Sequence, residues 1–258
     1  MLQAHGYRPI ALPHNSVAVE GADAIVNLRG ESIAGRWNAE KKAAIAASRI
    51  DGTKRLVASI AACTVKPQVL VSASATGYYG DRGEEELLEK SAPGNDFLAG
   101  VCVRWEAAAE EATALGVRVA TMRFGVVLGH GGALAQMKLP FALGLGGPMG
   151  SGRQYLPWIH LDDLTSLCRL ALDDPQLTGA VNAVAPEIVT NARFASALGA
   201  ALHRPAVLPA PAFAMRIALG EFADTLLGGQ RVIPAVAQSA GFRWAYPQLE
   251  PALRALFR

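Results

Sequence analysis

Short apolar runs alternate with longer segments whose apolar residues recur at helical spacing along most of the chain. The short runs, predicted as strands, cover residues 24–28, 69–74, 117–124 and 181–184. The helical patterns between and after them cover residues 38–62, 95–115, 133–143 and about 162–172. Strands that alternate with helices of this length form right-handed β-α-β units around a parallel sheet. The pattern therefore predicts an α/β fold.

Both ends of the chain depart from this alternation. Residues 2–5 are predicted as the tail of a helix, and Arg8–Leu12 as a short strand. Beyond Ala185 the patterns are mostly helical, at 190–202, 212–227 and 249–257. We therefore predict a sheet-bearing domain at 1–185 and a small, mostly helical C-terminal subdomain at 186–258.

One predicted strand leads into a cluster of polar residues. The stretch Val69–Gly80 reads VLVSASATGYYG, an apolar run followed by hydroxylated residues and a turn. Side chains at the carboxyl end of a parallel strand line the crevice where α/β folds bind ligands. The residues placed there are Ser72, Ser74, Tyr78 and Tyr79. The alternative is a buried strand with an ordinary turn, in which Ser74 only caps the strand end.

Composition narrows the classes of function. The net charge of the 258 residues is +2 and the basic residues are scattered, which argues against a nucleic-acid partner. Cys63, Cys102 and Cys168 lack metal-ligand spacing and are predicted to be reduced, and the five histidines do not cluster, so no metal site is predicted. No apolar run reaches the roughly 18 to 20 residues of a membrane helix. The first residues lack the features of a signal peptide, so we predict a cytoplasmic protein with no membrane partner.

Several strings now carry a family resemblance. They are NLRGESIAGRW, SRIDGTKRL, SASATGYYGD, DFLAGVCVRWE, RFGVVLGHGGALAQM, LGLGGPMGSGRQYLPWIHLDDL and GQRVIPAVAQSAGFRWAYP, in this order. The chain resembles the atypical extended short-chain dehydrogenase/reductases, specifically the epimerase-like subfamily of the NAD-dependent epimerase/dehydratase family, with a helical C-terminal extension of the DUF1731 type. The resemblance covers essentially the whole chain, and 144–164 is its most specific part.

This resemblance implies a Rossmann-type doubly wound parallel sheet that binds NADP(H) or NAD(H). It also implies oxidoreduction or epimerisation of a small-molecule substrate. In such proteins a strand and a G-x-x-G-x-x-G turn precede the helix that would end near Gly6, so we expect this chain to lack that first strand and phosphate-binding loop. Either Arg8–Leu12 fills the vacant place beside strand 24–28, or the sheet carries a gap.

The resemblance also implies catalytic residues. Ser74 stands where the family carries its catalytic hydroxyl, and Tyr78 or Tyr79 could offer a phenol. The family's Tyr-x-x-x-Lys pair is absent, because its positions hold Leu98 and Cys102, or Phe97 and Val101 one residue earlier. A rival hypothesis follows, in which the chain is a non-catalytic binding or partner-interaction form of the fold.

The implied cofactor contacts lie at two strand ends and on two helices. They are Leu28, Arg29, Gly30, Arg49, Ser72 and Cys102. Arg29 stands where the family has a small residue, and it either contacts a phosphate or blocks the site. Arg49 either contacts the cofactor or is an ordinary helix-surface residue.

The sequence also suggests roles for three residues in the loop and strand before the helix at 162–172. Arg153 and Gln154 follow GGPMGSG and are our candidates for polar contacts to the substrate. His160 precedes a helix whose N-cap is predicted to be Asp162 or Asp163, so we assign His160 to a hydrogen-bond network at the helix start rather than to catalysis.

Overall fold

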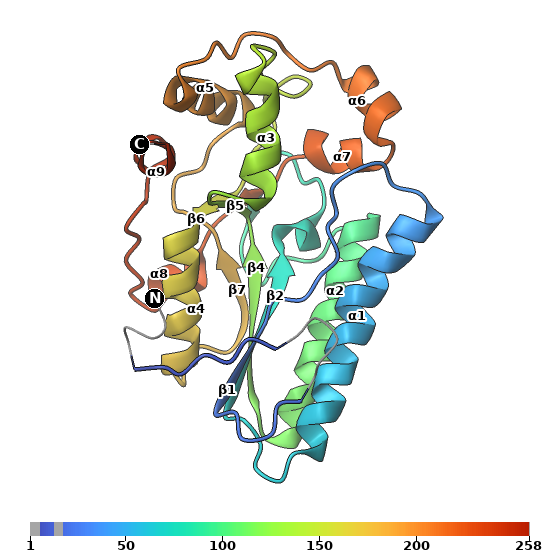
Figure 1. Ribbon diagram of the computed structural model, residues 1–258, viewed down its shortest axis with the longest axis vertical. Helices are drawn as coiled ribbons and strands as arrows, with labels where there is room; N and C mark the ends of the chain where they lie inside the picture. The colour runs from blue at the N-terminus through green and yellow to red at the C-terminus, as the bar shows by residue number, and fades with distance from the viewer. Residues whose placement is uncertain (1–5, 13–17, 258) are drawn as a thin grey trace.

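The main sheet of the protein has four parallel strands. The computed structural model describes residues 6–12 and 18–257. In sheet order the strands are β1 (Ala24–Asn27), β2 (Val69–Ala75), β4 (Arg118–Phe124) and β7 (Gly179–Ala183). Because every pairing is parallel, the carboxyl ends of all four strands meet at one edge, the upper one in Figure 1. The predicted α/β class is confirmed.

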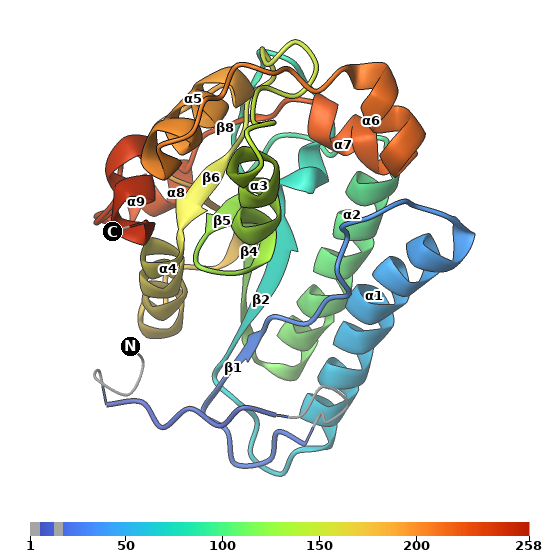
Figure 2. The same ribbon diagram turned by 45° about the horizontal axis from the view of Figure 1, so that its top comes forward.

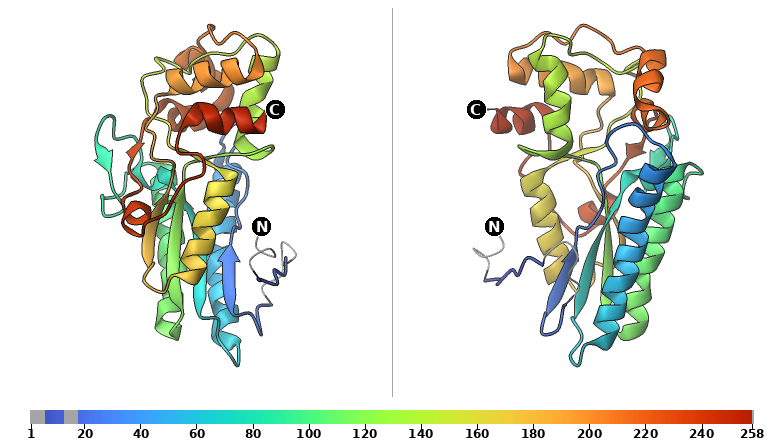
Figure 3. Two further views of the ribbon diagram at one scale, coloured as in Figure 1. Left: turned by 90° about the vertical axis from the view of Figure 1, so that its left-hand side faces the viewer. Right: turned by 45° about the vertical axis from the view of Figure 1, so that its right-hand side comes forward.

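Helices cover both faces of this sheet (Figures 1 and 3). One face carries α1 (Ala39–Ala62), α2 (Phe97–Glu110) and the 3-10 turn η3 (Glu111–Leu115). The other face carries α4 (Leu161–Asp173) and α8 (Ala235–Ser239). Ile25, Leu70 and Ile60 belong to the apolar cluster of the first face, whereas Val71, Met122 and Leu167 belong to that of the second. Alternate residues of β2 thus point to opposite cores, as a strand buried on both faces requires.

The ends of the helices follow from local hydrogen bonds. The Asn38 side chain accepts from the backbone N–H of Lys41 at the start of α1, and Asp96 accepts from Ala99 at the start of α2. At the start of α4 the predicted cap is wrong: Asp162 and Asp163 lie inside the first turn, and His160 is the N-cap. Its ring nitrogen Nδ1 accepts from the backbone N–H of Asp162 at 3.1 Å.

A second layer of helices lies over the carboxyl ends of the strands (Figure 2). It consists of α3 (Gly132–Ala142), α5 (Asn191–Leu202), α6 (Ala212–Leu219), α7 (Phe222–Leu227) and α9 (Leu249–Leu256). The helical pattern at 212–227 is two helices, because Gly220 adopts φ 61° and interrupts it. Residues of α3, α5 and α9 share one apolar cluster, so a helix from before Ala185 packs with the C-terminal helices. The division at Ala185 stays a prediction.

Two short parallel pairs and one turn connect the layers. β5 (Val126–Leu128) pairs with β6 (Trp158–His160), and β3 (Glu86–Leu87) pairs with β8 (Arg231–Val232). The 3-10 turn η2 (Thr76–Tyr79) follows β2 directly. The acidic segment of residues 80–90 thus contains a short strand, and its Leu87 is fully buried.

The strand predicted at Arg8–Leu12 is wrong. Residues 7–12 have no regular structure, and none of their backbone groups is hydrogen-bonded to β1. Pro9 in their middle has no N–H to donate to a ladder. Neither of the two expected arrangements forms, because within residues 6–12 and 18–257 the sheet simply ends at β1. The helical tail predicted at 2–5 lies outside the described residues.

Two observations from the described residues bear on the class of protein. None of the helices is long and apolar enough to cross a membrane. Cys63, Cys102 and Cys168 are free thiols.

The outer edge of β1 generates a prediction about solubility. Val26 on this strand is 37% exposed, and no strand of the described residues pairs with the outer edge of β1. An edge strand with an exposed β-branched residue favours pairing between molecules. Val26→Lys should slow aggregation, measured by light scattering at 37 °C, and should change the free energy of unfolding by less than about 1 kcal/mol. Ile25→Lys is the matched control, since Ile25 is buried and a lysine there should unfold the chain. Equal aggregation of wild type and Val26→Lys would contradict the prediction.

Candidate functional site

Ser74 lies at the carboxyl end of β2, one residue before the strand ends. It stands beside Arg123 of β4 in the sheet register. Its side chain is 2% exposed, and its hydroxyl donates a hydrogen bond to Oε1 of Glu106 at 2.6 Å. Because the hydroxyl proton is engaged by a carboxylate, Ser74 presents acceptor lone pairs to any further partner.

Glu106 of α2 is in turn held by Arg123. The Arg123 guanidinium donates from Nε to Oε1 at 2.8 Å and from a terminal nitrogen to Oε2 at 2.7 Å. Burial of Arg123 disfavours its charge, but the hydrogen bonds and the charge of Glu106 outweigh burial and raise the pKa of Arg123 above its usual value. The result is a buried bidentate ion pair that fixes the carboxylate facing Ser74.

The other side of Arg123 is held by a second set of hydrogen bonds. Its remaining terminal nitrogen donates to the Tyr79 hydroxyl and to the backbone carbonyl of Glu89, both at 2.9 Å. The Tyr79 hydroxyl donates to Oδ1 of Asn182 on β7 at 2.6 Å. The Asn182 amide donates to the carbonyl of Ile233 at 2.9 Å. The network thus ties β2, β4, β7 and α2 to the segment around β8.

Tyr78 lies against the same guanidinium. The Arg123 guanidinium carbon is 3.4 Å from the centroid of the half-buried Tyr78 ring, a close cation–π contact. Ser74 and Tyr78, predicted as a catalytic pair, therefore both meet the Arg123–Glu106 pair. The neighbouring Tyr79 is different: burial raises the pKa of its phenol to about 12, and its hydroxyl is committed to the network.

On the face of α2 beside Ser74, the positions of the family's Tyr-x-x-x-Lys pair hold no acid or base that is charged near neutral pH. Leu98 and Val101 are buried, and Cys102 is buried beside Ser74. Burial first, and then the charge of Glu106, raises the pKa of the Cys102 thiol to about 12. Cys102 is therefore a neutral, unreactive thiol near neutral pH.

A second buried network lies one strand away, at the end of β1. Asn27 and Ser72 are register partners, and the Asn27 amide donates to the Ser72 hydroxyl at 3.3 Å. The same amide donates to the Thr53 hydroxyl of α1 at 3.1 Å, which also accepts from the Trp105 indole at 3.0 Å. These bonds lock the ends of β1 and β2 to α1 and α2.

Arg49 and Gly30 lie against one another beside this second network. A Cβ at Gly30 would lie 3.0 Å from the Arg49 guanidinium, so a larger residue there would require that side chain to shift. The guanidinium donates to the backbone carbonyl of Glu31 at 2.9 Å and lies 5.2 Å from the Trp105 ring. Burial lowers the pKa of Arg49, and the nearby Cys102 and Glu31 act in the opposite direction. Arg49 is therefore a half-buried cation beside Trp105 of the second network, and its role as a cofactor contact stays a prediction.

The remaining predicted cofactor contacts lie in the loop that follows β1. Leu28 is 64% exposed, and the backbone N–H of Arg29 donates to Oδ1 of Asn27 at 3.4 Å. The roles assigned to Leu28 and Arg29 stay predictions.

The two predicted substrate contacts lie in the second layer. Arg153 is exposed, whereas the Gln154 amide donates to the carbonyls of Met149 at 2.9 Å and Leu226 at 3.3 Å. Gln154 therefore ties its loop to α7. Neither residue contacts Ser74, so their roles also stay predictions.

His160 has the structural position that its sequence context predicts. Besides capping α4, its ring stacks on Tyr246 with centroids 3.9 Å apart. The neighbouring Asp163 accepts the backbone N–H groups of Ala245 and Tyr246, which fastens the C-terminal segment to α4. The described residues contain no group of three or more side chains arranged to hold a metal ion.

Sequence reasoning missed the charged partners of Ser74. Arg123 is a cation near the carboxyl end of the strand RVATMRF, between Met122 and Phe124, and a buried cation needs a partner. That signal was available, but the sequence does not say that the partner is Glu106. Glu89, Asn182 and Asn27 carry no such signal, because polar residues at strand ends and in acidic loops are common.

Comparison with known proteins identifies the family. Residues 13–185 match the NAD dependent epimerase/dehydratase family, and residues 210–256 match a domain of unknown function, DUF1731. The chain belongs to this epimerase family. Its relatives include the chloroplastic SDR39U1 homologue of Arabidopsis thaliana, 44% identical over 93% of this chain and 70% of the relative. Mouse SDR39U1 is 42% identical over 90% of this chain and 81% of its own length.

Solved structures of the epimerase family agree with this assignment. Human SDR39U1 (isoform 2), crystallised with NADPH, superposes with a TM-score of 0.91 and 36% identity, over 99% of this chain and 92% of that one. A nucleoside-diphosphate sugar epimerase from Corynebacterium glutamicum superposes with a TM-score of 0.74 and 36% identity, over 93% of this chain and 47% of its own. UDP-glucuronic acid 4-epimerase from Bacillus cereus, at 14% identity, shares the fold.

The buried ion pair makes a prediction about stability. Glu106→Gln leaves the Arg123 charge buried without its counter-ion and should cost about 3–5 kcal/mol of unfolding free energy, measured by urea denaturation. The double variant Glu106→Leu/Arg123→Met removes both charges and should recover at least half of that loss. The control is Glu85→Gln, which breaks the exposed Arg82–Glu85 pair and should cost less than about 1 kcal/mol. A Glu106→Gln loss no larger than that of the control would contradict the prediction.

The cap of α4 makes a prediction about pH. Burial lowers the pKa of His160 below its ordinary value of 6.5, so the unfolded chain takes up this proton first as the pH falls. Stability from His160 is therefore present above about pH 6.5 and is lost below it, by at most about 1.4 kcal/mol per pH unit. Burial raises the pKa of Asp163, whose contribution falls as pH rises above its ordinary 3.8.

Comparison of the wild type with His160→Asn separates the contribution of His160 to stability from that of Asp163. Asparagine also caps helices, so His160→Asn keeps an N-cap and keeps Asp163 but loses the titration. Urea denaturation between pH 5 and 7.5 should show a smaller loss of stability on acidification in His160→Asn than in wild type. Parallel pH profiles would show that His160 does not titrate as stated.

Proposed function

We propose that this chain binds NADP(H) or NAD(H) across the carboxyl ends of β1 and β2 and acts as an oxidoreductase or epimerase on a small molecule. The bound nicotinamide would accept or donate a hydride. Support comes from the superposition on human SDR39U1 crystallised with NADPH. The observation that carries the proposal is the Ser74 hydroxyl, fixed at the strand end by Glu106.

The residues at these strand ends fit such a cofactor. The side chains from Ser72 to Ala75 are all small, so a flat ring could lie over the end of β2. Asn27 and Ser72 already hold the ends of the two strands together, which pre-organises the surface before a ligand arrives. Arg49 brings a partly buried cation to the same region, where it would attract the negative cofactor phosphates.

Ser74 would act through its oxygen rather than its proton. Because its hydroxyl donates to Glu106, its lone pairs would accept a hydrogen bond from a substrate hydroxyl or from the cofactor carboxamide. The Arg123–Glu106 pair would hold this orientation against rotation of the side chain. Tyr78 would be the phenol available to exchange a proton, since the Tyr79 hydroxyl is engaged with Asn182.

A second candidate function is cofactor binding without turnover. The observation that favours it is the apolar face of α2, where Leu98 and Cys102 offer no titratable group near neutral pH. The two candidates share the same surface and differ in whether a hydride moves.

Titration with NADPH and NADH, followed by nicotinamide fluorescence, tests the proposal. We expect saturable binding, weakened by Arg49→Gln about tenfold, as expected when a charge-assisted contact is lost. Ser74→Ala should weaken binding less than about tenfold but should lower carbonyl-dependent oxidation of NADPH about a hundredfold, because the oxygen that would orient the cofactor carboxamide is lost. Ser239→Ala, an exposed hydroxyl on α8, is the control and should change neither.

Three outcomes discriminate the candidates. Absence of binding up to about 1 mM of either cofactor would contradict cofactor binding altogether. That limit corresponds to a binding free energy of about 4 kcal/mol. Binding with no NADPH oxidation across aldehydes, quinones and nucleotide sugars would favour the second candidate. Equal oxidation by wild type and Ser74→Ala would remove Ser74 from the catalytic role.

A further inference from the structure

Two adjoining cavities lie in the second layer of helices, between α3, α5 and α9. Their volumes are about 280 and 470 Å³, and Ala201, His203 and Phe257 line both. We call the combined hollow the α5–α9 pocket. None of its lining residues takes part in the networks around Ser74 or Asn27.

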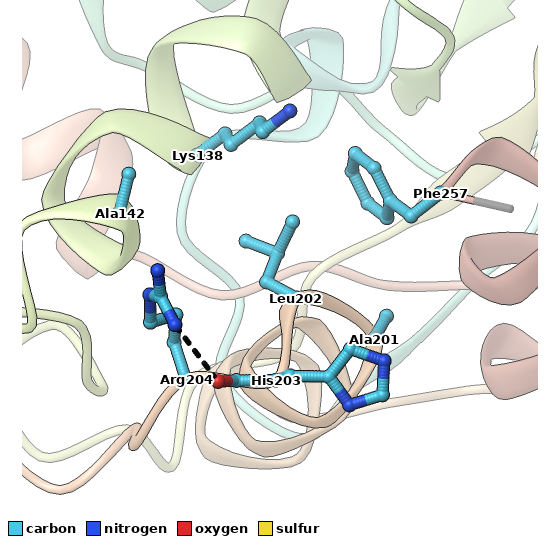
Figure 4. Close-up of a pocket in the computed structure, with 7 residues that line it drawn as sticks. All are labelled: Lys138, Ala142, Ala201, Leu202, His203, Arg204 and Phe257. Carbon is cyan, nitrogen blue, oxygen red and sulfur yellow. Dashed lines mark hydrogen bonds between the residues drawn. The ribbon is translucent and has the colours of Figure 1, made fainter.

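The pocket has an apolar floor and a basic rim. Leu202 and Phe257 are half-buried, and Figure 4 shows the Leu202 side chain in the middle of the view, with those of Lys138, Arg204 and Phe257 around it. The ammonium of Lys138 lies 5.2 Å from the Phe257 ring centroid. Lys138, Arg204 and the nearby Arg254 are all exposed, so their charges can reach a ligand.

The charge of the rim is not compensated by the acidic residues that the structure describes. Glu250 is the acidic residue of the lining, and it forms an ion pair with Arg193. Neither Lys138 nor Arg204 forms an ion pair with a described carboxylate. A concave apolar surface with uncompensated cations favours a ligand that is negative at one end and apolar at the other.

His203 ends α5 and lines both cavities. Among the described residues, it is the non-glycine residue with a positive φ, at 53°. It ends α5 in a left-handed conformation that glycine adopts without cost and that costs energy for a residue with a Cβ. A left-handed residue at the end of a helix is common, and histidine adopts this conformation more readily than most residues with a Cβ. The His203 imidazole lines both cavities, so this position places a polar ring in the pocket.

We propose that the α5–α9 pocket binds a small organic oxyanion with a flat apolar body. The apolar body would lie on Leu202 and Phe257, and the oxyanion would be held by Lys138 and by the forked guanidinium of Arg204. The Arg204 guanidinium has one described hydrogen bond, to the carbonyl of His203 at 3.4 Å, which leaves most of its donors available. The site is separate from the proposed cofactor surface.

Isothermal titration with phenyl phosphate tests the proposal. Inorganic phosphate lacks the apolar body and benzyl alcohol lacks the charge, so both should bind at least about tenfold more weakly than phenyl phosphate. Benzenesulfonate and benzoate show which oxyanion the rim prefers. Absence of phenyl phosphate binding up to about 10 mM, or equal binding of benzyl alcohol, would overturn the proposal.

A pair of charge-matched variants locates the site. Lys138→Gln/Arg204→Gln should weaken phenyl phosphate binding at least about tenfold, because two charge-assisted contacts are lost. Lys90→Gln/Arg243→Gln removes two exposed cations elsewhere and should leave binding unchanged. Both double variants should bind NADPH as wild type does, which keeps this test distinct from that of the proposed function. Equal phenyl phosphate binding by both variants would overturn the location.

His203→Gly separates a ligand role from a purely structural one. Glycine relieves the left-handed strain, so the urea midpoint should rise, while phenyl phosphate binding should fall at least threefold, on the order of one lost hydrogen bond. A higher midpoint with unchanged binding would remove His203 from the site.

Discussion

The structure depends on an ion pair between Arg123 of the central strand β4 and Glu106 of α2, the helix that packs on the sheet. Arg123 is 3% exposed, and such a group is tolerated only when each of its donors is satisfied. Glu106 satisfies one edge of the guanidinium, and Tyr79 and the Glu89 carbonyl satisfy another. These partners come from α2, η2 and the loop after β3. The requirement to satisfy one cation therefore draws separate parts of the chain to the carboxyl end of the sheet.

This constraint has a direct consequence for chemistry. The carboxylate that neutralises Arg123 also receives the Ser74 proton, so the serine oxygen is oriented by the same bonds that stabilise the fold. One strand away, Asn27 joins Ser72 to Thr53 and fixes the neighbouring strand end in the same manner. The proposed cofactor surface lies between two rigid polar networks, as a site that must hold a ligand in one geometry requires.

Sequence patterns predicted the strands and helices that alternate along the chain. They did not predict contacts between residues that are far apart in the sequence. Periodicity located the four strands of the main sheet, because each is a short apolar run between helical patterns. The apolar residues of Arg8–Leu12 predicted a strand. Pro9 lacks the backbone N–H that hydrogen bonding to a neighbouring strand needs. Ser74 and Tyr78 were placed correctly at the strand end, but Glu106, 32 residues from Ser74, is brought there only by the packing of α2 on the sheet. The His160 cap was missed because an imidazole is an uncommon N-cap.

We propose that Ser74, held by Glu106 and Arg123, faces the nicotinamide of a bound cofactor. A crystal structure of this chain with NADPH measures that most directly. We predict that the nicotinamide lies over the end of β2, with the Ser74 oxygen within about 3.5 Å of the carboxamide nitrogen. The hydrogen bond from Ser74 to Glu106 should be intact in the complex. A nicotinamide bound elsewhere, or Ser74 turned away from Glu106 in the complex, would contradict the account.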